Sequence, residues 1–290
     1  MSWRTVVISS NAKLDYQLGY LVVRKDVTTK IHLSEIAILL IESTAVSLTA
    51  SLLNELVKCK VRVIFCDEKR NPASELFPYY GSHDTSIKVR KQVQWTSDTK
   101  TRVWTEIVTE KIRKQMEFLV ELDCEEANLL NTYLKQIEFG DCTNREGHAA
   151  KVYFNALFGM AFTRGEDSPC NAALNYGYSI ILSAINREIA INGYVTQMGL
   201  FHDNMFNPYN LGSDLMEPFR ILVDRAVYKL QPQIFEHEEK MKMVDVLNLE
   251  VYVEGRKEYV SNAIKIYVRS IFEALEDDDI SLIKFYRNEL

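Results

Sequence analysis

Short apolar runs separated by polar, turn-like segments dominate the first 70 residues of the chain. The runs are rich in β-branched residues and have the length of β-strands; they lie at residues 5–9, 20–24, 30–33, 36–42 and 61–67. Residues 44–59 change to helical spacing and place Leu48, Leu52 and Leu56 on one face. The pattern predicts a small β-rich domain that carries one helix.

The regular pattern breaks at residues 71–86, where prolines and a glycine mark a loop or linker. Beyond it, apolar positions recur with helical spacing, and a β-hairpin is expected around Glu254-Gly255. One or two helices are expected at 87–120, and single helices at 125–138, 145–160, 172–193, 214–230 and 261–275. The predicted fold class is α+β, with a β-rich N-terminal domain at 1–84 and a larger, mostly α-helical C-terminal domain at 85–290.

Composition narrows the class of protein. The apolar fraction of 47% supports a sizeable core and argues against disorder. The net charge of −6 means that binding of nucleic acid would need a local basic surface. The five cysteines form no CxxC pair, so a reduced, cytoplasmic protein is expected rather than a disulfide framework. No segment has the pattern of a signal peptide or a membrane span.

Candidate chemistry gathers in one stretch, residues 199–225. His202 precedes a turn-rich loop, and Asp214 and Glu217 follow it three positions apart, so on one helix they would share a face. A further carboxylate, Glu146, stands at the head of the helix expected at 145–160. Imidazole and carboxylate groups on separate elements can hold a divalent metal, so these four residues are the candidate catalytic set.

A purely structural interpretation of these residues is also open. Asp214-x-x-Glu217 has the form of a helix capping box, and Pro218 suits the first turn of a helix. A histidine that follows an apolar residue, as His202 does, is commonly a packed structural side chain. His148 lies two positions from Glu146 and would point elsewhere on a helix, so it is not expected to be a ligand.

One segment has a charge opposite to that of the whole chain. Residues 88–114 contain eight basic residues against three acidic ones, a net +5. This segment is either a solvated helix face or a surface that contacts phosphates. The candidate DNA contacts, taken from this segment and from the neighbourhood of the site, are Lys88, Arg90, Lys91, Arg113, Lys114, Arg145, Lys151, Arg164 and Arg220. Arg220 and Arg225 could equally form structural ion pairs.

Several segments, in this order, resemble one known family. They are REGHAAKVYFNALFG, ALNYGYSIILSAINREIAINGY, MGLFH and SDLMEPFR, with MSWRTVVIS and VRVIFCDEKRNP nearer the N-terminus. Together they resemble the CRISPR-associated spacer-acquisition endonuclease/integrase of the adaptation module, in the branch that accompanies type II systems. The resemblance covers essentially the whole chain. It places the family's metal-site glutamate at Glu146, its histidine at His202 and its acidic pair at Asp214 and Glu217. Which of the two acids touches the ion stays open.

The resemblance implies a metal-dependent integrase/endonuclease that uses Mg²⁺ or Mn²⁺. It would join the 3′-hydroxyl ends of short duplex DNA to the CRISPR array. The implied ligands are Glu146, His202 and Glu217, although His202 could instead transfer a proton. The implied partners are double-stranded DNA, a second copy of the chain that pairs through the N-terminal domain, a small ferredoxin-like adaptation protein and other CRISPR adaptation proteins. The alternatives are a metal-dependent nuclease without integration, or a non-catalytic DNA-binding subunit.

Overall fold

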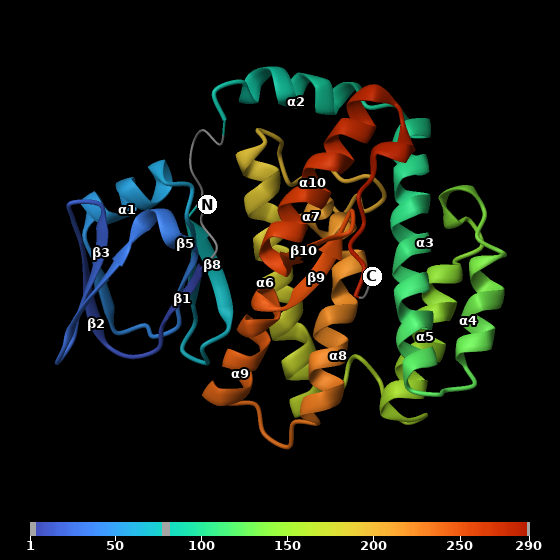
Figure 1. Ribbon diagram of the computed structural model, residues 1–290, viewed down its shortest axis with the longest axis horizontal. Coiled ribbons are helices and arrows are strands. Elements are labelled where there is room, and N and C mark those ends of the chain that lie inside the picture. The colour runs from blue at the N-terminus through green and yellow to red at the C-terminus, as the bar shows by residue number, and fades with distance from the viewer. Residues whose placement is uncertain (1–3, 77–81, 289–290) are drawn as a thin grey trace. The chain divides into compact units, whose positions relative to one another are not determined.

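The computed structural model describes residues 4–76 and 82–288 (Figure 1). The chain divides into two compact units, Met1–Thr85 and Ser86–Leu290. The first is rich in strands and the second in helices, so the predicted α+β class is confirmed. Each unit has its own fold and is described separately below.

The N-terminal unit contains two four-stranded sheets and one α-helix within its described residues. In the first sheet β1, β5 and β7 run parallel and β8 pairs antiparallel with β7. In the second sheet β3 pairs antiparallel with both β2 and β4, and β6 runs parallel to β2. The strands are β1 (Arg4–Ile8), β2 (Ala12–Gln17), β3 (Tyr20–Arg24), β4 (Thr28–His32), β5 (Ile36–Ile41), β6 (Val46–Leu48), β7 (Arg62–Cys66) and β8 (Pro72–Leu76), and the helices are η1 (Leu33–Glu35) and α1 (Ala50–Lys58).

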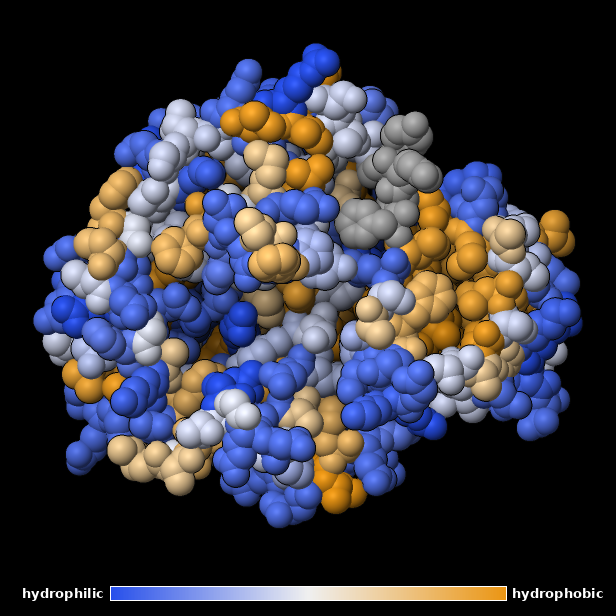
Figure 2. Space-filling view, turned by 180° about the vertical axis from the view of Figure 1, so that it is seen from behind, coloured by the Kyte–Doolittle hydropathy of each residue, from blue (hydrophilic) through white to orange (hydrophobic). Residues whose placement is uncertain are grey.

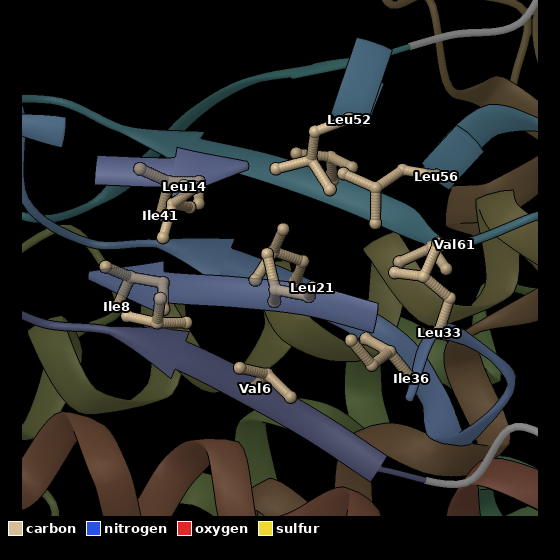
Figure 3. Close-up of a cluster of buried hydrophobic side chains, with 13 residues drawn as sticks. Val6, Ile8, Leu14, Leu21, Leu33, Ile36, Ile41, Leu52, Leu56 and Val61 are labelled. Carbon is tan, nitrogen blue, oxygen red and sulfur yellow. The ribbon is translucent and has the colours of Figure 1, made fainter. Parts of the chain in front are cut away.

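The two sheets and α1 share one apolar core (Figure 3). Val6 and Ile8 come from the first sheet, Leu14 and Leu21 from the second, and Leu52 from α1. Thr49 caps α1 by accepting a hydrogen bond from the backbone of Leu52, so the helix begins later than the pattern over residues 44–59 predicts. Strand β2 was not expected, because Leu14 is its one fully buried residue and its other positions are polar or half-exposed.

The C-terminal unit is built on two long helices. α3 packs against α4, α5, α8 and α10, while α6 packs against α8, α9 and α10 (Figure 1). The helices are α2 (Thr85–Gln94), α3 (Ser97–Glu121), α4 (Ala127–Leu134), η2 (Phe139–Asp141), α5 (Arg145–Phe158), α6 (Pro169–Ile191), α7 (Asn210–Leu215), η3 (Glu217–Phe219), α8 (Arg220–Leu230), α9 (His237–Val244), η4 (Asp245–Asn248), α10 (Val260–Asp277) and η5 (Ile280–Leu282), and the hairpin strands are β9 (Glu250–Val253) and β10 (Arg256–Tyr259).

Local signals explain where the long helices begin and end. Thr96 caps α3 and separates it from α2, so the pattern at 87–120 is two helices. Ser168 caps α6, Pro169 occupies its first turn, and Gly193 follows its end with a φ of 86°. The hairpin expected at Glu254-Gly255 is confirmed. None of the helices in the described residues is long and apolar enough to cross a membrane.

One predicted helix is wrong. The segment expected as a single helix over 214–230 consists of α7, a 3₁₀ turn and α8. Asp214 is the penultimate residue of α7, and no side chain caps η3 or α8, so the capping-box interpretation of Asp214 and Glu217 is wrong as well. The break at Met216 lets the two carboxylates point in different directions, which shapes the site described next.

Candidate functional site

Glu146 is held at the head of α5 by two capping side chains. Asn144 accepts a hydrogen bond from the backbone of Gly147 at 3.3 Å. Asp141 accepts from the backbone of Arg145 at 2.8 Å and from that of Glu146 at 2.9 Å. These bonds satisfy donors of the first helical turn and fix the backbone that carries the Glu146 side chain.

Glu146 and Glu217 both pair with the ammonium group of one lysine. Lys111 of α3 contacts Oε1 of Glu146, and its Nζ lies 2.5 Å from Oε2 of Glu217. Nε of Arg220 lies 2.9 Å from the other oxygen of Glu217. The Glu217 side chain is only 4% exposed, so these positive charges compensate a carboxylate removed from water. The acid pair, Glu146 and Glu217, therefore converges on one cation position.

Asp214 points away from the acid pair and into the loop before α7. One of its oxygens accepts from the backbone N–H groups of Leu200 and Phe201, at 2.6 and 3.1 Å. The other accepts from the backbone of His202 at 3.2 Å and lies 2.5 Å from Nδ1 of its ring. A Cβ at Gly199 would lie 2.3 Å from the carbonyl oxygen of His202, so the loop can close around the carboxylate only with glycine there.

The charged groups of the site shift one another's pKa values. The hydrogen bond that the ring donates to Asp214 raises the pKa of His202 against the effect of burial, and the charges of Asp214, Glu217 and Glu146 raise it further. Burial would raise the pKa of Glu217, but Arg220 and Lys111 hold that pKa below its ordinary value. Burial also disfavours the charged form of Lys111, yet the acid pair raises its pKa. At neutral pH the cluster thus holds an ionised Glu217 and a charged Lys111.

The acid pair has the chemistry of a site for a hard divalent cation. Carboxylate oxygens are the ligands that Mg²⁺ and Mn²⁺ prefer, and the ammonium group of Lys111 stands where the two carboxylates converge. Over residues 4–76 and 82–288, no group of three or more His, Cys, Asp or Glu side chains is arranged to hold a metal. Because both oxygens of Asp214 are already engaged, the candidate ligands are the acid pair with His202 beside it.

A small cavity adjoins Glu217. Its volume is about 50 Å³, and Lys111, Arg164, Arg220 and Asp224 are among its lining residues. The guanidinium group of Arg220 lies over the Tyr178 ring at 4.7 Å, and the Tyr178 hydroxyl donates to buried Asp224. Burial raises the pKa of Asp224 to about 6, although two tyrosine hydroxyls bond to the carboxylate. This chain of contacts positions Arg220 against Glu217.

Several cations of the basic segment are neutralised by ion pairs within the C-terminal unit. Lys88 and Lys91 both pair with Glu276 at the end of α10, at 2.7 and 2.9 Å. Arg113 contacts Glu110. Arg90 is exposed and has no side-chain partner within the described part of the chain.

Lys114 requires a correction. Its side chain is 0% exposed; it donates to the carbonyl oxygen of Tyr286 at 2.7 Å and pairs with Glu110 at 3.2 Å. Its ammonium group also lies 3.5 Å from the centre of the Tyr286 ring. A buried lysine with three such partners is part of the core of the unit, so the expectation that Lys114 contacts DNA is wrong.

The other four candidate DNA contacts lie on α5, α8 and the loop before α6. Arg145 stacks over the Tyr133 ring at 5.5 Å, and Lys151 is exposed on α5. Arg164 bonds to Asn175 at 2.7 Å. Arg220 pairs with Glu217 and is about one third exposed. Of these, Lys151 has the side chain most open to solvent.

Lys111 and Asp141 were missed as members of the site. Lys111 was counted only as one charge of the basic segment, because nothing in the sequence links it to two acids far along the chain. The sequence did point to Asp141 as a capping residue, because aspartate and asparagine just before a helix, here Asp141 and Asn144, are typical caps. Trp104 and Phe201, whose rings stack beside His202, gave no signal beyond their apolar character.

The fold and the site define a class: α+β proteins in which a helical unit presents an acid pair and a carboxylate-bound histidine around one cation position. Comparison with known proteins identifies the family. The family model for CRISPR associated protein Cas1 matches residues 5–262. The CRISPR-associated endonuclease Cas1 of Neisseria meningitidis serogroup C (strain 8013) is 31% identical over 291 residues, covering 98% of this chain and 96% of the relative. The chain belongs to the Cas1 family of CRISPR-associated proteins.

Solved structures share the fold. A casposase bound to integration product superimposes with a TM-score of 0.77 at 19% identity, covering 96% of this chain and 91% of the casposase chain. A Cas1 protein from Thermotoga maritima gives a TM-score of 0.76 at 17% identity, covering 95% and 97%. At these identities the similarity shows the common fold.

Proposed function

We propose that this protein is a metal-dependent DNA integrase/endonuclease of CRISPR adaptation. The observation that carries the proposal is the convergence of Glu146 and Glu217 on one cation position beside His202. Membership of the Cas1 family supports it, as do a relative named as an endonuclease and a structural neighbour bound to an integration product. The reaction is the joining of a DNA 3′-hydroxyl to a phosphodiester of the CRISPR array.

Glu146, Glu217 and His202 would hold Mg²⁺ or Mn²⁺. When bound, the ion would polarise the attacked phosphate and neutralise the charge that develops on it. Of Asp214 and Glu217, the proposed ligand is Glu217, because Asp214 already accepts from three backbone N–H groups and the His202 ring. Lys111 supplies positive charge between the acids in the metal-free protein.

The chain's own residues can also move the proton that the reaction requires. The attacking 3′-hydroxyl forms a new P–O bond and loses its proton to water. The bond to the old 3′-oxygen breaks, and that oxygen takes up a proton. Asp214 engages Nδ1 of His202 and raises the pKa of the ring, so one ring nitrogen remains free: it either joins the acid pair as a metal ligand or, when the ring is protonated and binds no metal, protonates the departing oxygen. Arg220 lies next to Glu217, where it can contact a phosphate oxygen.

The partners proposed for this reaction are double-stranded DNA, a second copy of the chain and a small ferredoxin-like adaptation protein. Two structural neighbours are Cas6-RT-Cas1–Cas2 complexes, and another is a Cas1–DNA complex. On the face shown in Figure 2, apolar residues gather on the N-terminal unit at the right of the view. An apolar surface of this kind suits the proposal that this unit pairs with a second copy.

Strand joining tests the proposal directly. Purified protein, with and without its small partner, is incubated with end-labelled short duplexes, a supercoiled plasmid that carries the array, and Mg²⁺ or Mn²⁺. The expected result is transfer of label to the plasmid, lost in Glu217→Gln and retained in Glu166→Gln, which alters an exposed glutamate in the loop after α5. Cleavage without joined label would instead indicate a nuclease, and DNA binding without metal-dependent chemistry would indicate an assembly subunit.

A further inference from the structure

Two aromatic rings stack in parallel beside His202. The rings of Trp104 on α3 and Phe201 lie 4.6 Å apart, centre to centre, with 2° between their planes. Trp104 is 1% exposed, whereas Phe201 is 56% exposed. Trp104 therefore covers one face of the Phe201 ring, while more than half of the Phe201 residue meets solvent.

The position of the Phe201 ring is fixed from several sides. Its backbone N–H donates to Asp214 at 3.1 Å. The His202 ring stands nearly perpendicular to both aromatic rings, at 84° to Trp104 and 87° to Phe201, with centres within 6 Å. Asn210 donates to the carbonyl oxygens of Gln197 and Asn204, which closes the surrounding loop. Phe201 is thus a rigid apolar surface attached directly to the histidine of the site.

The neighbourhood of this ring favours a nucleic-acid base as its ligand. A flat, exposed aromatic ring on a buried aromatic support is the form of protein platform on which unpaired bases stack. Arg220, about one third exposed in the same site, can contact the phosphate that accompanies a base. A base inside a duplex already stacks on both faces, so a free aromatic ring selects a base that is unpaired or frayed.

We propose that Phe201 is a stacking platform for an unpaired base at the reacting end of the DNA. The proposal rests on the proposed function, because it assigns the substrate a single-stranded terminus at the site. Stacking on Phe201 would place the nucleotide beside His202 and hold it while the duplex portion lies elsewhere on the protein. The same ring would distinguish processed, overhanging ends from blunt ends.

The test compares the binding of two DNAs without a catalytic step. One is a blunt duplex, and the other carries three unpaired nucleotides at each 3′ end, with 2-aminopurine as the terminal base; Ca²⁺ replaces Mg²⁺. Phe201→Ala is expected to weaken binding of the overhanging DNA by about 5- to 150-fold and to abolish the fluorescence quenching of 2-aminopurine, with little effect on the blunt duplex. Phe201→Tyr, which keeps an aromatic ring, is expected to retain both the affinity for the overhanging DNA and the quenching of 2-aminopurine.

A matched control is available in the same unit. Phe139 is 55% exposed, nearly the same as Phe201, but has no aromatic partner within the described residues. Phe139→Ala is expected to leave both affinities and the quenching unchanged. Equal losses for blunt and overhanging DNA, unchanged quenching in Phe201→Ala, or a change of oligomeric state in that variant would overturn the proposal. If the wild-type protein joins strands but Phe201→Ala keeps its preference for overhangs, this inference fails while the proposed function stands.

Discussion

Asp214 holds both the ring and the backbone of His202 with one carboxylate oxygen. That oxygen lies 2.5 Å from Nδ1 of the ring and 3.2 Å from the backbone nitrogen of the same residue. The second oxygen binds the backbone of the two preceding residues. Asp214 is thus a positioning residue, and it sets both the direction and the protonation of the imidazole.

Asp214→Asn is expected to lower the pKa of His202 toward its ordinary value of 6.5. The amide lacks the negative charge that stabilises the protonated ring, and its NH₂ group meets a backbone donor. Strand joining should fall about 10- to 100-fold. An NMR titration of the ring measures the pKa, and Asp203→Asn, which alters an exposed neighbour, is the control. An unchanged pKa of His202 in Asp214→Asn would contradict this account.

The different roles of Asp214 and Glu217 could not be read from their spacing. Three positions apart on one helix, the two carboxylates would share a face. The chain instead leaves α7 after Leu215 and turns at Met216, so Asp214 faces residues 200–202 and Glu217 faces α3. The α+β class and the long helices were predictable because they follow local patterns, whereas the candidate site residues also depended on the family resemblance. Lys111, by contrast, joins the site through packing of α3 against α5 and η3, which no local pattern encodes.

Metal binding should stabilise the folded protein through the acid pair. Mn²⁺ at 100 times its Kd is expected to add about 2.7 kcal/mol to the free energy of unfolding. Glu146→Gln and Glu217→Gln should each lose most of that gain, while Glu166→Gln keeps it. Thermal unfolding with a titration of Mn²⁺ measures the effect. An equal Mn²⁺-dependent shift in all three variants would mean that the ion binds elsewhere.

Lys111→Met tests whether the lysine and the metal occupy the same place. Without metal, the substitution leaves the buried Glu217 with Arg220 as its main counter-charge and should cost about 3–5 kcal/mol of stability. Mn²⁺ should restore more stability to this variant than it adds to the wild type, because no ammonium group competes with it. If Mn²⁺ rescues the variant no more than the wild type, the lysine does not occupy the place of the ion.

Asp224 should make stability depend on pH. Its ordinary pKa is 3.8 and its pKa in the folded protein is about 6, so the folded state binds the proton more tightly. The contribution to stability is full below pH 3.8 and is lost as the pH rises through about 6, a change on the order of 3 kcal/mol. Asp224→Asn should remove this part of the difference in unfolding free energy between pH 4 and pH 7. Asp167→Asn, in an exposed loop, should retain it.

The ion pairs of Lys88 and Lys91 show why the net charge of a segment did not predict which of its side chains are free to contact DNA. The net charge of +5 was read correctly from the sequence, but Glu276 approaches the two lysines from nearly 190 residues away. Burial opposes ionisation of Glu276, yet bonds from Lys88, Tyr194 and Lys91 lower its pKa to about 2. The resulting stabilisation is present above the ordinary pKa of 4.5 and is lost as the pH falls toward 2.

Glu276→Gln should therefore strengthen DNA binding if this face of α2 contacts the phosphate backbone. The substitution frees two ammonium groups, and each new phosphate contact should steepen the slope of log affinity against log salt by about 0.9. Duplex binding measured over a salt series at pH 7 provides the test. Glu273→Gln is the matched control, because it lies on the same helix and releases only the exposed Arg269. Arg90→Ala should weaken binding by one contact. Lys114 is not substituted, because it is buried and does not face the DNA. Unchanged affinity and salt slope in both Glu276→Gln and Arg90→Ala would place the DNA path away from α2, toward Lys151 and the loop that carries Phe201.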